Sequence, residues 1–165
     1  MTAEEKGSLF RKRFLQTSFG QFLQIRNEYS ILFQALSDED VQRLDEMNIF
    51  FCRSYAPSCV TELKHTPAVE TMRLIVFEAE HLKKLSPEEV VAIILHEIGH
   101  VFNPHQDLQQ REFNADDFAI SKGYGKHIKS SLTKSISTEP TAFDNPINRA
   151  RVKRITELLK SNTIK

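Results

Sequence analysis

The chain has 165 residues, with 22 basic and 22 acidic side chains and a formal net charge of zero. This length predicts one domain over residues 1–165 with a substantial core, and the balanced charge predicts no nucleic-acid partner. No apolar run approaches the roughly 20 residues of a membrane span, and residues 1–6 lack a signal-peptide core, so we expect a soluble, cytoplasmic protein.

Residues 1–70 are expected to form a helical part followed by an irregular segment. Apolar side chains recur at helical intervals over residues 8–35, which predicts one or two amphipathic helices that join near Gly20. Ser37 and Asp40 form a capping-box pattern that starts a further helix running toward Phe51. The phenylalanines of this part are interpreted as core residues.

Residues 52–69 contain prolines and both cysteines but little periodicity, which predicts a loop. The spacing of Cys52 and Cys59 is wider than that of a usual zinc-binding pair, so we expect free thiols in a reducing compartment. A thiolate that blocks a metal as a latency switch is the alternative.

Residues 71–165 are expected to form a metal-binding catalytic core that begins with a β-rich segment. Residues 72–78 are rich in residues that favour strands and are bounded by polar residues, which predicts a strand. An edge strand just before a metal-binding helix can pair with an extended substrate, and an interior strand without substrate contact is the alternative.

The helix predicted over residues 87–102 carries the most informative pattern, His96-Glu97-Ile98-Gly99-His100. It starts at a serine followed by proline and two glutamates, which is typical of a helix N-terminus. Two histidines four residues apart lie on one helix face and can bind one zinc ion, while Glu97 can act as the general base. This spacing predicts a zinc-dependent hydrolase.

A catalytic zinc site has three protein ligands, so a third is expected downstream. We predict Glu112, on a second helix over residues 108–122 that folds back antiparallel after Pro104, with Gly99 easing the packing. Asp116, four residues after Glu112, is then placed to accept the second N–H of a zinc-bound histidine. The other candidates, of which His105 is the main rival, are His105, Asp107, Asp116, Asp117 and His127.

The spacing of apolar residues and the prolines after residue 125 predict a helix over residues 126–136, a loop over 137–145 and a last helix over 146–159. Gly123 and Gly125 are expected to close the helix that precedes them. His65, His81 and His127 have no spacing relation to the motif and are interpreted as ordinary surface or half-buried histidines.

Residues 85–100, followed by Glu112-Phe113-Asn114-Ala115-Asp116, resemble the active-site helices of gluzincin metallopeptidases, especially peptidase family M48 with its Ste24 and HtpX proteases. In that family an H-P pair and an R-I pair precede the last helix, and here Asn145-Pro146 and Arg151-Val152 occupy those places. The resemblance implies an α+β, mostly helical, zincin-like fold and a peptidase that cleaves protein or peptide substrates. It also implies a role in catalysis for Asn145 and for Arg151, which would either brace the active site or touch the substrate.

Three features depart from the family: Asn145 replaces a histidine, the gap from His100 to Glu112 is short, and the membrane helices are missing. An asparagine amide can still donate a hydrogen bond to an oxyanion. We therefore predict Asn145, together with Arg151, as the oxyanion donor, with Tyr124 and His127 as alternatives. A catalytically silent or latent zinc-binding protein and a regulatory protease of ImmA/IrrE type are the competing functions.

Overall fold

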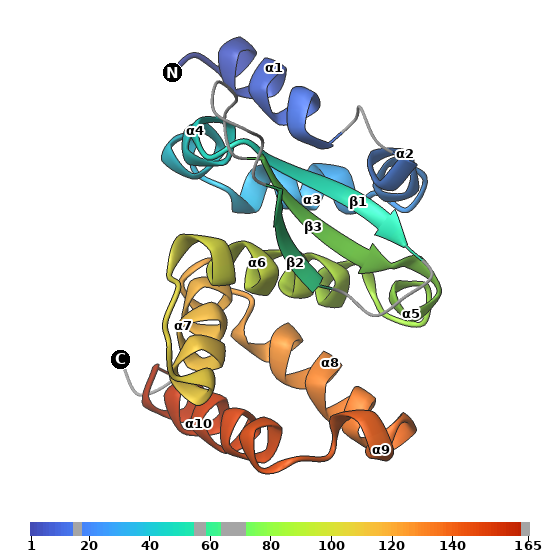
Figure 1. Ribbon diagram of the computed structural model, residues 1–165, viewed down its shortest axis with the longest axis vertical. Helices are drawn as coiled ribbons and strands as arrows, with labels where there is room; N and C mark the ends of the chain where they lie inside the picture. The colour runs from blue at the N-terminus through green and yellow to red at the C-terminus, as the bar shows by residue number, and fades with distance from the viewer. Residues whose placement is uncertain (15–17, 55–58, 64–71, 163–165) are drawn as a thin grey trace. The chain divides into compact units, whose positions relative to one another are not determined.

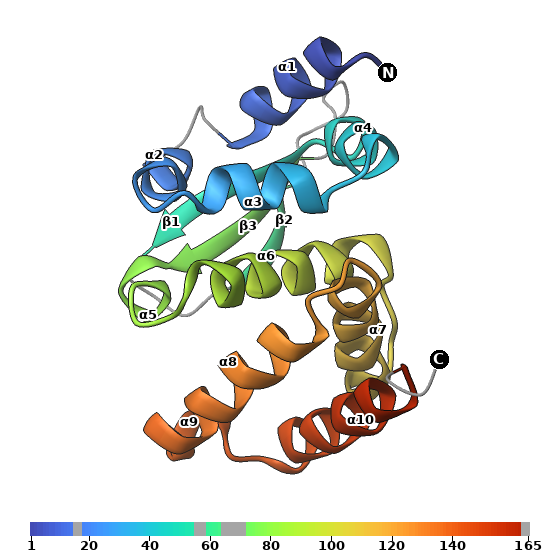
Figure 2. The same ribbon diagram turned by 180° about the vertical axis from the view of Figure 1, so that it is seen from behind.

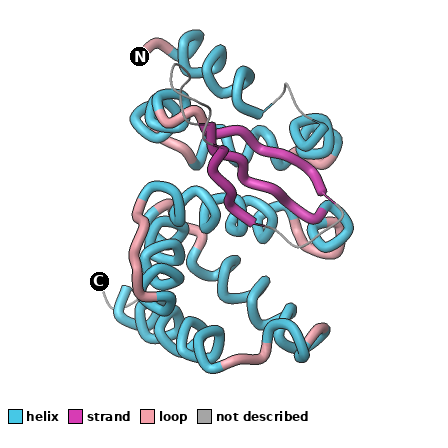
Figure 3. The backbone as a smooth tube through the Cα atoms, viewed as in Figure 1, coloured by secondary structure: helices cyan, strands magenta, loops and turns pink. Residues whose placement is uncertain are grey.

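The computed structural model describes residues 1–14, 18–54, 59–63 and 72–162. The chain divides into two compact units, Met1–Pro87 and Glu88–Lys165. Helices dominate, and the strands among the described residues all lie in the first unit (Figure 3). This composition confirms the predicted α+β, mostly helical class, whereas the single domain stays a prediction.

The first unit begins with four helices in place of the predicted one or two before Ser37 and one after it. They are α1 (Ala3–Phe14), α2 (Ser18–Ile25), α3 (Glu28–Ala35) and α4 (Asp38–Glu46), as labelled in Figure 1. Gly20 lies inside α2, so the expectation that it joins two helices is wrong. The turn between α2 and α3 instead uses Asn27, whose φ of 65° is tolerated by asparagine better than by most residues.

The capping box at the start of α4 is confirmed. The Ser37 side chain accepts from the Asp40 backbone N–H, and the Asp40 carboxylate accepts from the Ser37 backbone N–H. The helix ends at Glu46 instead of continuing toward Phe51, because Asn48 adopts a positive φ of 51°. The chain then enters strand β1 (Ile49–Ser54), so the helical prediction for these residues is wrong.

Three strands form one small sheet in the order β1-β3-β2, with β2 spanning Cys59–Leu63 and β3 spanning Met72–Glu78. β3 confirms the predicted strand and is parallel to β1 and antiparallel to β2. Because both of its edges are already paired, β3 has no free edge for an extended substrate. The expectation of an edge strand is therefore wrong, and β3 is an interior strand of the sheet.

The two cysteines lie on opposite sides of this central strand. Cys52 of β1 and Cys59 of β2 are both in register with Val76. Since neighbouring strands are about 4.8 Å apart, their Cα atoms are separated by about 10 Å, beyond the roughly 7 Å limit for a disulfide. Cys52 is a free thiol, as predicted, and burial raises its pKa; the side chain of Cys59 lies outside the described residues.

Phenylalanines form the core of the first unit, as predicted. Phe14 stacks on Phe51 with ring centroids 4.0 Å apart, and Phe19 stacks on Phe77 at 4.6 Å. Buried Arg13 joins α1 to the last turn of α4, since it donates to the Asp45 carboxylate at 2.7 Å.

The second unit is built from helices, seen from behind in Figure 2. They are α6 (Pro87–Phe102), α7 (Leu108–Ser121), α8 (Gly125–Thr138), α9 (Pro140–Phe143) and α10 (Pro146–Asn162), while the short α5 (Ala79–Leu82) precedes them. The predicted helices are confirmed, but α9 lies where a loop was expected. Within the described residues, no helix combines the length and apolarity needed to cross a membrane.

Local chemistry explains the junction between α7 and α8. Gly123 adopts a positive φ of 88°, its N–H bonds to the Ile120 carbonyl, and the Tyr124 N–H bonds to the Ala119 carbonyl. This pair of bonds is the Schellman arrangement that ends many helices at glycine. α6, α8 and α10 then share an apolar core of Ala92, Ile128 and Ile155.

Candidate metal centre

The helix α6 places the two motif histidines side by side. The ring centroids of His96 and His100 are 4.6 Å apart, and the rings are steeply inclined to each other at 80°. Together with Glu97, they offer ligand atoms that all lie within 4.8 Å of one another. His96 is only 5% exposed, so its ring nitrogens need partners inside the protein.

A close contact between two helices brings further carboxylates to this pair. α7 crosses α6 steeply in Figures 1 and 2, so the expected antiparallel packing is wrong. At Gly99, an added Cβ would lie 2.8 Å from the Ala115 Cα and 3.0 Å from the Phe118 Cβ. The prediction that Gly99 eases close packing is confirmed, and this contact presents the adjoining residues Glu112 and Asp116 of α7 to the motif.

Glu112 approaches both histidines at the separation expected of metal ligands. Its Oε2 lies 3.4 Å from Nε2 of His96, and its Oε1 lies 3.5 Å from Nε2 of His100. Two ligands that are each about 2.0–2.1 Å from a tetrahedral zinc ion lie about 3.3–3.4 Å apart. These separations, made by the two oxygens of one carboxylate, would allow the three side chains to hold a metal ion.

Asp116 fixes the orientation of His96. Its Oδ1 lies 2.9 Å from the Nδ1 of His96, and its side chain is fully buried. Asp116 holds the proton on Nδ1, so release of the Nε2 proton would leave a lone pair directed toward Glu112, which is the tautomer that a metal requires. The partnership predicted for Asp116 is therefore present in the structure.

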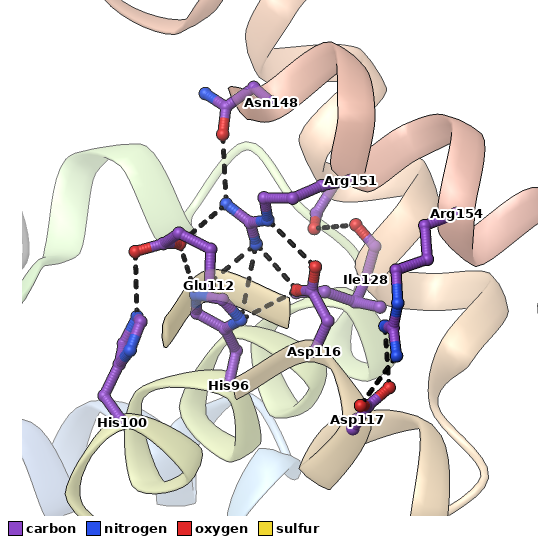
Figure 4. A network of polar contacts seen from close by, with 10 residues as sticks. His96, His100, Glu112, Asp116, Asp117, Ile128, Asn148, Arg151 and Arg154 are labelled. Carbon is purple, nitrogen blue, oxygen red and sulfur yellow. Dashed lines mark hydrogen bonds and ion pairs between the residues drawn. The ribbon is translucent and has the colours of Figure 1, made fainter. Parts of the chain in front are cut away.

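Arg151 of α10 joins the two carboxylates, as Figure 4 shows. Its Nε and one terminal nitrogen donate to the two oxygens of Asp116 at 2.9 and 2.8 Å, and its other terminal nitrogen lies 3.1 Å from Oε2 of Glu112. This planar, two-pronged pairing fixes the carboxylate of Asp116 in both position and rotation. These contacts match the bracing role that the sequence allowed for Arg151, and its contact with substrate stays a prediction.

Asn148 is a member of the cluster that the sequence did not indicate. Its Oδ1 accepts from Arg151 at 3.1 Å, and its amide donates to the Phe143 carbonyl at 2.8 Å. Asn148 precedes Arg151 by three residues, so both lie on one face of α10. This spacing was the one sequence signal for Asn148, and it could be recognised only once the structure had shown the position of Arg151.

Opposing effects set the charges of the cluster. Burial raises the pKa of Glu112, but the hydrogen bond from His96 and the charges of His96 and Arg151 outweigh it and lower the value to about 2. Burial and the Arg151 charge lower the pKa of His96, yet its bonds to Asp116 and Glu112 raise it to about 9. Burial is the main reason that the pKa of His100 falls to about 4.

Glu97 lies in a different environment from Glu112. Burial raises its pKa, and the negative charge of Glu112 adds to this effect against the positive charges of His96 and Arg151. A carboxylate whose proton affinity is raised is a stronger proton acceptor than an exposed one. The pKa shifts therefore favour the ionised form of Glu112, as a metal ligand requires, and favour proton uptake by Glu97.

Asn145 lies at the start of α10, where its Oδ1 accepts from the backbone N–H of Asn148 at 2.9 Å. Asparagine before a proline at the first helical position is a common helix start, so this capping role was readable from the sequence. Within the described part of the chain, no hydrogen bond joins Asn145 to His96, His100 or Glu112. Its role as an oxyanion donor stays a prediction.

The other candidate ligands do not join the cluster. His105 is exposed, and its Nδ1 accepts from the backbone of Asp107, while Asp107 caps α7 and Asp117 pairs with Arg154. His127 contacts the ring of Tyr124. His81 lies in α5 of the first unit, and His65 lies outside the described residues.

No family model, curated protein or solved structure matches this chain. The cluster of His96, Glu97, His100 and Glu112 must therefore be interpreted from its own geometry.

Proposed function

We propose that this chain is a zinc-dependent metallopeptidase of gluzincin type with a zincin-like fold, related to peptidase family M48. The observation that carries the proposal is the approach of the Glu112 oxygens to the two Nε2 atoms at 3.4 and 3.5 Å. Those separations suit a tetrahedral ion, and the Asp116 contact suits a metal-binding tautomer of His96.

The donor set favours zinc over the other common divalent metals. Imidazole nitrogens suit zinc, whereas calcium and magnesium prefer sites built from oxygen atoms. Three protein ligands also leave one position open, which is typical of catalytic zinc and not of structural zinc. His96, His100 and Glu112 are the residues that would hold the ion.

When bound, zinc would supply a Lewis acid that polarises a substrate carbonyl and lowers the pKa of a water molecule. Glu97 then accepts a proton from the attacking water and delivers it to the leaving amine. Its raised pKa suits both halves of this transfer. Arg151 and Asp116 act indirectly, by holding Glu112 and His96 in place.

Stabilisation of the oxyanion is assigned to Asn145, whose side-chain oxygen caps α10 and whose amide nitrogen remains a donor for substrate. Arg151 is less suited to this role, because its guanidinium is already bonded to Asp116, Glu112 and Asn148. A zinc-binding protein without catalysis is the second candidate, favoured by this capping of Asn145.

The test compares Glu97→Gln with Glu88→Gln, which changes another glutamate of the same helix. Zinc affinity is measured by calorimetric titration. The rate of hydrolysis is measured with unfolded casein and with a mixed library of quenched fluorescent peptides. We expect Glu97→Gln to keep zinc affinity within about twofold and to lose about 10²–10⁴-fold in rate, and Glu88→Gln to keep both.

The outcomes separate the two candidates. Zinc binding by the wild type without any hydrolysis supports the non-catalytic protein. Undiminished turnover by Glu97→Gln refutes the role of Glu97 as the general base. Failure of the wild type to bind zinc refutes both the peptidase and the non-catalytic zinc-binding protein.

A further inference from the structure

A groove of about 520 Å³ lies along α8, on residues that the metal cluster does not use. Its lining comes from one face of α8 and from one side chain of α10. The residues are Lys126, Lys129, Ser130, Thr133, Lys134, Ser137, Thr138 and Leu159. The α8 members recur at intervals of three and four, so they form a continuous stripe about 18 Å long on the helix surface.

The stripe is positively charged. Within the described residues, Lys126 and Lys129 have no ion-pair partner, and the side chain of Lys134 is 52% exposed. Lys134 contacts Glu89 at 2.7 Å, and Ser130 donates to the same carboxylate at 2.7 Å. Glu89 therefore offsets one of the three ammonium charges, and two remain for a ligand.

Three hydroxyl groups of the stripe can accept hydrogen bonds from a ligand, because their own protons are already donated within α8. Thr133, Ser137 and Thr138 each donate their proton to a carbonyl one turn earlier on α8, at 2.8, 3.0 and 3.0 Å. A hydroxyl whose hydrogen is used in this way still has a lone pair available to a partner's N–H. The groove thus combines cations with hydrogen-bond acceptors.

These features select the chemistry of the partner. An extended peptide carries backbone N–H donors, and acidic side chains add the negative charge that complements Lys126 and Lys129. A nucleic acid also carries negative charge, but its N–H donors lie on the bases and not along the backbone, where those of an extended peptide recur. A stretch of about six extended residues spans the stripe, at roughly 3.3 Å per residue.

We propose that the groove on α8 binds an extended acidic peptide segment. The carboxylates of the segment pair with Lys126 and Lys129, and its backbone N–H groups donate to the hydroxyl oxygens of Thr133 and Ser137. Leu159 supplies the apolar contact at the α10 side of the groove. This inference goes beyond the proposed peptidase function and stands without it.

The experiment uses the full chain without added zinc and a fluorescein-labelled octapeptide of alternating glutamate and serine. Fluorescence anisotropy measures its dissociation constant, next to an octapeptide with glutamine in place of glutamate and an eight-nucleotide oligothymidylate. We expect the acidic peptide to bind at least fivefold more tightly than either comparison ligand.

Three variants locate the site. Lys129→Glu should weaken binding of the acidic peptide at least fivefold, because an attractive pair becomes a repulsive one. Thr133→Val, which removes one acceptor on an exposed helix face, should weaken it about twofold to threefold. Lys153→Glu, on exposed α10 surface, makes the same change of charge as Lys129→Glu and should alter binding by less than twofold.

Each outcome decides the proposal. Loss of affinity in Lys129→Glu but not in Lys153→Glu supports it. Equal losses in both lysine variants, equal binding of the oligothymidylate, or no saturable binding up to 1 mM peptide overturns it.

Discussion

Replacing Gly99 with alanine tests how the two helices of the metal centre depend on each other. The new Cβ would lie 2.8 Å from the Ala115 Cα and 2.9 Å from the Ala115 carbonyl oxygen. Carbon atoms normally touch at about 3.5 Å, so α7 must move away from α6 by about 0.7 Å. Metal–ligand distances tolerate only about 0.2 Å, and Glu112 moves with α7.

We therefore expect Gly99→Ala to weaken zinc binding about 10–100-fold, a loss similar to that seen when a residue supporting a metal ligand is removed. Overpacking should also lower the free energy of unfolding by about 1–3 kcal/mol, against a gain of at most about 1 kcal/mol in helix propensity. Zinc affinity is measured by competition with a chelating dye, and stability by urea unfolding.

Gly7→Ala is the matched control. Gly7 lies in α1 of the other unit, and a Cβ there would meet the nearest atom, in the Arg11 side chain, at an ordinary 3.6 Å. This variant should keep wild-type zinc affinity and gain about 0.5–1 kcal/mol in stability. Wild-type zinc affinity and stability in Gly99→Ala would refute the role assigned to the close contact.

Asp116→Asn should weaken zinc binding about 10–100-fold in the dye assay, because the buried amide no longer neutralises Arg151 or orients His96 as a carboxylate does; unchanged affinity would contradict this. Glu28, fully buried beside Arg26, has a pKa that burial raises from 4.5 to about 7. The folded chain therefore binds this proton more tightly than the unfolded chain, and up to about 3 kcal/mol of stability present below pH 4.5 is lost as the pH rises to 7. Urea unfolding of Glu28→Gln should lack this loss, whereas exposed Glu39→Gln should keep it; equal pH profiles for both variants would show that Glu28 is not responsible.

The grouping of the residues in the candidate metal centre could be predicted from the sequence because helix periodicity controls their spacing. His96 and His100 lie one turn apart on α6, and Glu112 and Asp116 lie one turn apart on α7, so each pair shares a face before any tertiary contact is known. The start of α6 could also be predicted, because a serine followed by proline and two glutamates is a local pattern typical of helix N-termini. Gly99 could be named because a glycine inside a buried helix usually serves close packing.

The parts that could not be predicted depend on tertiary contacts. Phe50 and Phe51 suit a helix or a strand equally, and it is pairing of β1 with β3 that decides between them. No periodicity distinguishes a central strand from an edge strand, which is why the position of β3 was missed. The crossing of α7 over α6 depends on contacts between the two helices, such as the one at Gly99 and Ala115, and the short loop after Pro104 did not reveal it.

Arg151 illustrates the same limit within the site. Its sequence position suggested a place near the chemistry, but only the structure shows that its guanidinium bonds to Asp116 and Glu112. A residue that supports metal ligands and one that touches substrate have the same sequence pattern. Their roles separate only when the partners of the side chain are known.

The most direct test of the metal centre is a calorimetric zinc titration of the wild type beside Glu112→Ala, with Asp117→Ala as a second carboxylate variant of α7. We expect one zinc ion per chain in the wild type and in Asp117→Ala, and an affinity at least 100-fold weaker in Glu112→Ala. Equal affinity in all three proteins, or no zinc bound by the wild type, would contradict a metal held by His96, His100 and Glu112.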